Sequence, residues 1–102
     1  MITQFTQDSI KESTKPIVIK AFATWCPHCT SMKPIFEQLE KELGQKYLFT
    51  ELDIDTSPKL AQELEVISLP TFIFIKDKKE TGRVIGDIEH DKLKADIEKH
   101  LS

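Results

Sequence analysis

Two nearly continuous apolar runs, at residues 17–23 and 71–75, stand out in the pattern of hydrophobic and polar positions along the chain. Runs of this length without regular polar alternation are typical of strands that a sheet buries on both faces. Three further strands are predicted at residues 3–6, 47–54 and 80–85. The last of them follows a turn at 77–79 and is expected at the edge of the sheet. The pattern therefore predicts five strands.

Helical spacing of apolar residues is found between and after these strands. The longest such segment begins at Pro27 and ends at Gly44, and shorter ones are predicted at 8–13, from Pro58, and at 89–101. The resulting order, β-α-β-α-β-α-β-β-α, implies parallel crossovers first and antiparallel strands last. We therefore expect an α/β fold, a central mixed five-stranded sheet flanked by four helices.

Length and charge narrow the class of protein. A chain of 102 residues fits one compact domain, residues 1–102. The net charge is −3, from 14 basic and 17 acidic residues that are interspersed. Without a basic stripe or polybasic cluster, neither nucleic acid nor a membrane is an expected partner. Residues 1–13 lack the apolar core of a signal peptide, so a cytoplasmic location is expected.

The two cysteines lie in one short motif, Cys26-Pro27-His28-Cys29. A bridge between them closes almost no loop and restricts the unfolded chain very little, so reactivity explains the pair better than stability does. Two other interpretations are half of a zinc site and inert core cysteines. The other histidines, His90 and His100, are ten residues apart and lack ligand spacing. We expect no metal and no cofactor.

The position of the motif between a strand and a helix has a chemical consequence. Cys26 is expected at the helix N-terminus, where free N–H groups and the helix dipole favour a thiolate. Cys29 follows one turn later and can resolve a mixed disulfide, so we expect an exposed Cys26 of low pKa and a shielded Cys29. Pro27 suits the first helical turn, and His28 offers a positive charge beside Cys26.

The segment Phe22-Ala23-Thr24-Trp25-Cys26-Pro27-His28-Cys29 resembles the active-site segment of the thioredoxin superfamily. Further matches follow in the expected order over essentially the whole chain: Pro34, Asp53-Ile54-Asp55, Leu69-Pro70-Thr71-Phe72 and Gly86. The resemblance implies a thioredoxin fold and a thiol–disulfide oxidoreductase in which Cys26 is the nucleophile and Cys29 the resolving thiol.

The same resemblance implies how a substrate is held. The residue matching Pro70 is a cis-proline that lies against the cysteine pair in the family. The backbone before it, at Leu69, pairs with an extended substrate segment. Trp25, Ile67, Leu69 and Gly86 are then expected to form an apolar collar around the Cys26 sulfur.

The chain departs from the family pattern at three places. Pro27-His28 replaces the Gly-Pro of cytosolic reductants and is similar to the dipeptide of periplasmic thiol oxidases, whose large helical insertion 102 residues cannot hold. Lys20 stands where the family has a buried acid, and Glu51 stands where it has the facing lysine. We expect these two charges to pair beneath Cys29, with Glu51 taking the base role and Lys20 lowering the Cys29 pKa.

The combined expectation is a monomeric reductant of protein disulfides that thioredoxin reductase regenerates. Two alternatives stay open. The first is a thiol oxidase or disulfide isomerase, because the dipeptide between the cysteines points to a more oxidising couple. The second is a thioredoxin-fold binding module whose redox activity is incidental.

Overall fold

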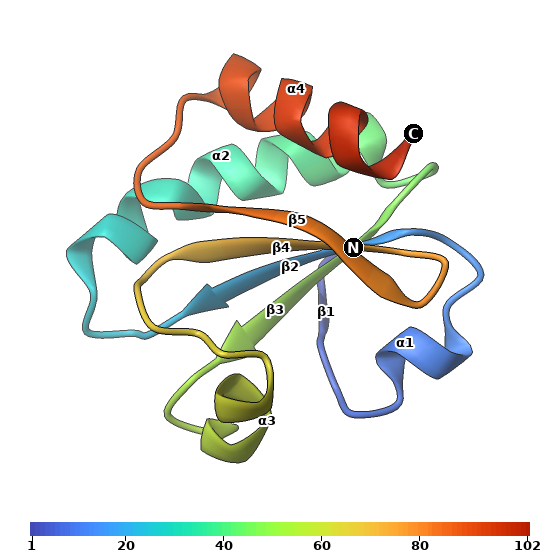
Figure 1. Ribbon diagram of the computed structural model, residues 1–102. Coiled ribbons are helices and arrows are strands. Elements are labelled where there is room, and N and C mark those ends of the chain that lie inside the picture. Colours follow the sequence, from blue (N-terminus) through green and yellow to red (C-terminus); the bar gives the residue numbers. More distant parts are fainter.

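The computed structural model describes residues 1–102 and places all five strands in one mixed sheet (Figure 1). The strand order across the sheet is β1-β3-β2-β4-β5. The strands β1, β3 and β2 are parallel, whereas β4 is antiparallel to both β2 and β5. Their bounds are β1 (Thr3–Gln4), β2 (Ile17–Phe22), β3 (Leu48–Asp53), β4 (Thr71–Lys76) and β5 (Lys79–Ile85).

Four helices cover the sheet: α1 (Ser9–Glu12), α2 (Pro27–Leu43), α3 (Pro58–Glu63) and α4 (His90–Leu101). Figure 1 shows α2 and α4 side by side over one face, with α1 and α3 on the other. The predicted α/β class, the order of elements and the mixed five-stranded sheet are confirmed. None of the helices is both long and apolar enough to cross a membrane.

The two apolar runs form the central strands β2 and β4, and successive side chains enter two different cores. Val18 packs with α2 and α4, whereas Ile17 and Ile19 pack on the α3 side. In β4, Phe72 and Phe74 lie on the first side, and Ile73 and Ile75 lie on the second. Because both faces are covered, neither strand needs polar alternation.

This topology brings the predicted site residues to one edge of the sheet. Because β4 is antiparallel to β2, the start of β4 lies beside the end of β2, and Thr71 pairs with Ala21. The chain leaves β2 into Cys26 and enters β4 from Pro70, so these two residues share that edge. Helix α2 ends at Leu43 with Gly44 as its C-cap, although this glycine has a right-handed φ of −64° rather than the left-handed value common at this position.

Candidate active site

Both cysteines lie at the first turn of α2 as free thiols. Cys26 is the N-cap residue, with extended backbone angles of φ −89° and ψ 116°, and Pro27 is the first helical residue. The side chains are largely enclosed, because Cys26 is 6% exposed and Cys29 is 3% exposed. The expectation of an exposed Cys26 is therefore wrong. The neighbours that pack against the two cysteines are Phe22, Ala23, Ile54 and Leu69.

Several hydrogen bonds favour the anionic form of Cys26. The Cys29 thiol donates a hydrogen bond that lowers the pKa of Cys26, and the backbone N–H groups of Cys29 and His28 act in the same direction. Burial and the carboxylate of Asp87 oppose them without reversing the shift. The free N–H groups of a helix N-terminus thus stabilise the thiolate, as the sequence predicts.

At Cys29, the effects that raise the pKa outweigh those that lower it. Burial, followed by the hydrogen bond to Cys26, raises the pKa of Cys29 to about 11, although a hydrogen bond from the Ala23 backbone and the charge of Lys20 act in the opposite direction. The Cys29 thiol is therefore protonated at neutral pH in the reduced protein. It must lose a proton before it can attack a disulfide.

The imidazole of His28 points to a different partner from the one expected. Its Nδ1–H donates to Oδ2 of Asp87 at 2.5 Å, and both side chains are largely exposed. The backbone N–H of His28 supports the Cys26 thiolate, whereas the neighbouring Asp87 carboxylate opposes it. The expected stabilisation of the thiolate by a positive imidazole is therefore replaced by a backbone contribution.

An apolar groove runs beside Cys26. Trp25 forms one wall and is exposed, while its Nε1–H donates to Oδ2 of Asp55 at 2.8 Å, which fixes the indole. Ile67 also lines the groove and is 89% exposed. The complete lining is Trp25, Cys26, Ile54, Val66, Ile67, Ser68 and Leu69. Three of the four residues expected in the collar are thus brought together.

Gly86 is the fourth collar residue, and it does not line this groove. Its N–H donates to the carbonyl of Pro70 at 2.9 Å, and its φ of 97° is one that glycine adopts readily. The peptide bond between Leu69 and Pro70 is cis. Gly86 is therefore a backbone partner of Pro70 rather than part of the groove wall.

Lys20 and Glu51 face each other across adjacent strands, as their register in β2 and β3 requires. Lys20 Nζ lies 3.3 Å from Oε2 of Glu51. The lysine side chain is 4% exposed and that of Glu51 is 38% exposed, so the pair connects the interior with solvent. Nζ also lies 5.1 Å and 5.3 Å from the ring centres of Phe22 and Phe36.

The pair shares a cavity with the Cys29 thiol. Cys29 and Thr30 line it from α2, together with Lys20, Glu51 and Lys33. The charge of Lys20 lowers the pKa of Cys29 from within this cavity. The structure therefore forms the expected ion pair and places it next to Cys29.

Some residues of the site have no signal of their own in the sequence. Asp87 and Lys33 are ordinary surface charges there, and Val66 and Ser68 belong to an unremarkable loop. Asp55 is a partial exception, since it belongs to a segment that carries the family resemblance. Their roles depend on distances that only the folded chain defines.

Comparison with known proteins agrees with this geometry. The family model described as Thioredoxin matches residues 2–99. Thioredoxin H4 of Arabidopsis thaliana is 40% identical over 93 residues, which are 91% of this chain and 77% of that protein. The crystal structure of the thioredoxin NaTrxh from Nicotiana alata has a TM-score of 0.86 at 31% identity and covers 99% of this chain and 93% of its own. The bifunctional thioredoxin reductase/thioredoxin of Mycobacterium leprae is 32% identical over 77 residues, 76% of this chain and 17% of that protein.

Proposed function

The chain belongs to the thioredoxin family, and from this we propose that its thiol–disulfide exchange runs in the reducing direction, from thioredoxin reductase to protein disulfides. The observation that carries the exchange chemistry is the contrast between the two thiols, and the surroundings of His28 support the reducing direction. One thiol at the start of α2 has a lowered pKa, and its neighbour has a pKa raised to about 11. A cytoplasmic, monomeric protein is part of the same proposal.

The contrast supports a two-step exchange. The Cys26 thiolate attacks one sulfur of a substrate disulfide, which forms a mixed disulfide and releases the other substrate sulfur as a thiolate. Cys29 then gives up its proton and attacks the Cys26 sulfur. The second substrate thiolate leaves, and Cys26 and Cys29 are joined in a disulfide. Two electrons pass from the protein to the substrate, and thioredoxin reductase returns them.

The groove beside Cys26 is the proposed substrate site. Ile67, Leu69 and Trp25 offer an exposed apolar surface next to the sulfur. The backbone before Pro70 is proposed to pair with an extended substrate segment, as in strand addition. Gly86 supports that backbone through its hydrogen bond to the Pro70 carbonyl.

Glu51 is the proposed base for the resolving step. It lines the cavity that holds Cys29, it is held by Lys20 at 3.3 Å, and its half-exposed side chain can pass a proton to solvent. The Lys20 side chain is only 4% exposed, and its charge stabilises a Cys29 thiolate. Relative to the family pattern, the acid and the lysine have therefore exchanged strands: the lysine is on β2 and the acid is on β3.

The reducing direction is favoured over the oxidase alternative by the surroundings of His28. A strong oxidant stabilises its reduced form, chiefly through the thiolate of the first cysteine. Here the imidazole pairs with Asp87, and that carboxylate opposes the Cys26 thiolate. We therefore expect a potential closer to the roughly −270 mV of thioredoxin than to the roughly −120 mV of the periplasmic oxidase.

Equilibration of the Cys26–Cys29 couple with glutathione buffers measures this potential. Catalysed reduction of insulin with NADPH and thioredoxin reductase measures the activity, with Cys26→Ser as the inactive control. We expect a reducing potential and sustained turnover. A potential near that of the oxidase would reverse the proposed direction, and absence of exchange with any disulfide would leave only a binding module.

A further inference from the structure

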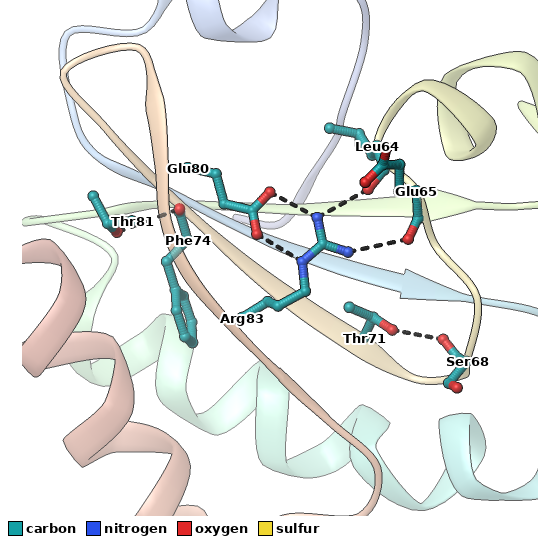
Figure 2. Close-up of polar contacts among 8 residues, drawn as sticks. All are labelled: Leu64, Glu65, Ser68, Thr71, Phe74, Glu80, Thr81 and Arg83. Atoms are coloured by element: carbon teal, nitrogen blue, oxygen red, sulfur yellow. Dashed lines mark hydrogen bonds and ion pairs between the residues drawn. The ribbon is translucent and has the colours of Figure 1, made fainter.

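Arg83 lies on the edge strand β5, yet its side chain reaches the loop that follows α3. Its Nη2 donates to the carbonyl of Leu64 at 2.9 Å, and its Nη1 donates to the carbonyl of Glu65 at 3.2 Å. Figure 2 shows the planar guanidinium between these two carbonyls and the carboxylate of Glu80. One side chain therefore ties two segments that are far apart in the sequence.

Glu80 holds the guanidinium in this orientation. Its two oxygens accept hydrogen bonds from Nε and Nη2 of Arg83, each at 2.6 Å (Figure 2). Such a two-point contact fixes the plane of the guanidinium as well as its position. The remaining donors then point at the loop, because the fork of an arginine is rigid.

The loop needs such support where Arg83 binds it. Helix α3 closes with hydrogen bonds from the N–H of Glu65 to Gln62 and from the N–H of Val66 to Ala61. The residue in this turn with a left-handed backbone is Glu65, at φ 57°, a conformation that favours glycine. The carbonyls of Leu64 and Glu65 lie outside the helix and accept from Arg83, which stabilises the turn.

The far end of the same loop is held independently. Oγ1 of Thr71 donates to the carbonyl of Ser68 at 2.6 Å, as Figure 2 also shows. Between these two anchors lie Val66 and Ile67, which line the groove beside Cys26. The groove wall is therefore a short segment clamped at both ends, with Ile67 exposed in its middle.

We propose that Arg83 is a positioning residue for substrate recognition: it holds the loop 64–69 in the shape that forms the groove wall, and so sets the affinity for protein disulfides without taking part in the exchange. This inference rests on the proposed function. Loss of the clamp should lower the population of the groove conformation that binds substrate. The thiols on α2 should keep their surroundings, because the separate hydrogen bond from Thr71 to Ser68 still holds the end of the loop that carries Leu69.

The test compares Arg83→Gln with Lys79→Gln, which removes the same charge from the same strand at an exposed position. Steady-state reduction of insulin gives KM and kcat, and reaction with the small disulfide dithiobis(nitrobenzoate) reports the thiols alone. For Arg83→Gln we expect KM for insulin to rise about three- to tenfold, from the loss of two hydrogen bonds. We expect kcat and the small-disulfide rate to stay at the wild-type value, and Lys79→Gln to match the wild type throughout.

Two more variants separate positioning from general stability. Arg83→Lys keeps the charge but loses the fork, so its KM should lie between those of the wild type and Arg83→Gln. Glu80→Gln leaves Arg83 in place but weakens its orientation, so KM should rise by a smaller factor even where Arg83→Gln does not fold. Hydrogen exchange should accelerate at the amides of Glu65 and Val66, whose hydrogen bonds close the turn, in Arg83→Gln and Glu80→Gln, and stay slow across the β2–β4 ladder.

The outcomes also distinguish this inference from the proposed function. An unchanged KM in Arg83→Gln and Glu80→Gln, with active wild-type protein, overturns the role of Arg83 alone. A parallel fall in the insulin and small-disulfide rates also overturns it, because that would show damage to the thiols. Failure of the wild-type protein to reduce either disulfide contradicts the proposed function itself.

Discussion

At the scale of single residues, the two thiols acquire opposite properties from surroundings only one helical turn apart. Cys26 receives hydrogen bonds from the Cys29 thiol and from two backbone N–H groups, whereas Cys29 is dominated by burial. Neither cysteine is freely exposed. Reactivity therefore follows from the stabilised charge of the Cys26 thiolate more than from access of solvent to the sulfur.

The first prediction concerns the pH dependence of alkylation. Cys26 should react with iodoacetamide with a midpoint below the usual range of a thiol, and Cys29 should react only as the pH approaches about 11. Cys29→Ala removes the hydrogen-bond donor and should move the Cys26 midpoint upward, whereas Cys29→Ser keeps a donor and should move it less. Mass spectrometry of the labelled protein reads both sites. Equal midpoints in the two variants would contradict the role of the Cys29 thiol.

The second prediction concerns Glu51. Glu51→Gln keeps a polar partner for Lys20 but removes the base, so resolution of a mixed disulfide should slow by about tenfold or more, while the first attack by Cys26 is retained. Rapid acid quenching of the reaction with a disulfide peptide measures both steps. Glu37→Gln, which lines the adjoining cavity on α2, is the matched control. Resolution at the wild-type rate in Glu51→Gln would show that the carboxylate is structural only.

At the scale of elements, the turn between β4 and β5 has a backbone conformation that its two residues do not favour. Lys76 pairs with Lys79, so Asp77 and Lys78 form a two-residue turn, and their φ values are 53° and 67°. Positive φ at both positions is the type I′ geometry, which prefers glycine at the second. The sequence Asp77-Lys78-Lys79 predicts a turn, but it does not predict the backbone strain that a left-handed φ causes at Lys78.

The third prediction follows from this strain. Lys78→Gly should increase the free energy of unfolding by about 1 kcal/mol, because glycine adopts the left-handed region without a Cβ clash. Lys79→Gly, one residue later and within the strand, should instead destabilise the protein. Urea unfolding of the three proteins measures the difference. A loss of stability in Lys78→Gly would show that the lysine side chain outweighs the backbone strain.

At the scale of the whole molecule, charged side chains join the two helices that cover one face of the sheet. His90 at the start of α4 pairs with Glu42 in the last turn of α2 at 3.0 Å, while Asp91, Lys94 and Gln38 complete the cluster. The hydrogen bonds that His90 donates to Asp91 and Glu42 raise the pKa of His90, and the hydrogen bonds that Glu42 accepts from Gln38 and His90 lower the pKa of Glu42. The two helices are thus linked by an ion pair that depends on pH.

The fourth prediction gives the sign of that dependence. The raised pKa of His90 adds stability that is complete below its unfolded value of about 6.5 and is lost as pH rises through the folded value. The lowered pKa of Glu42 adds stability that is lost as pH falls through its folded value. His90→Gln should therefore cost more stability at mildly acidic pH than at alkaline pH. Thermal unfolding of His90→Gln, Glu42→Gln and the double variant measures the coupling, and a cost independent of pH would contradict it.

Much of this architecture was predictable because its causes are local. The apolar runs that become β2 and β4 specify the buried strands, and the register that follows puts Lys20 opposite Glu51. The partners of His28 and Arg83 were not predictable, since Asp87 lies 59 residues from His28 and the Leu64 carbonyl lies 19 residues from Arg83. Their contacts depend on loop shapes, which hydrophobic periodicity does not encode.

Trapping of the mixed disulfide shows directly which of the two cysteines attacks the substrate. Cys29→Ser protein is mixed with insulin, quenched with acid and mapped by mass spectrometry, beside Cys26→Ser as the control. We predict a covalent adduct on Cys26 that accumulates in Cys29→Ser, and none in Cys26→Ser. Adducts on Cys29 in the control, or no adduct on Cys26, would contradict the assignment of Cys26 as the nucleophile.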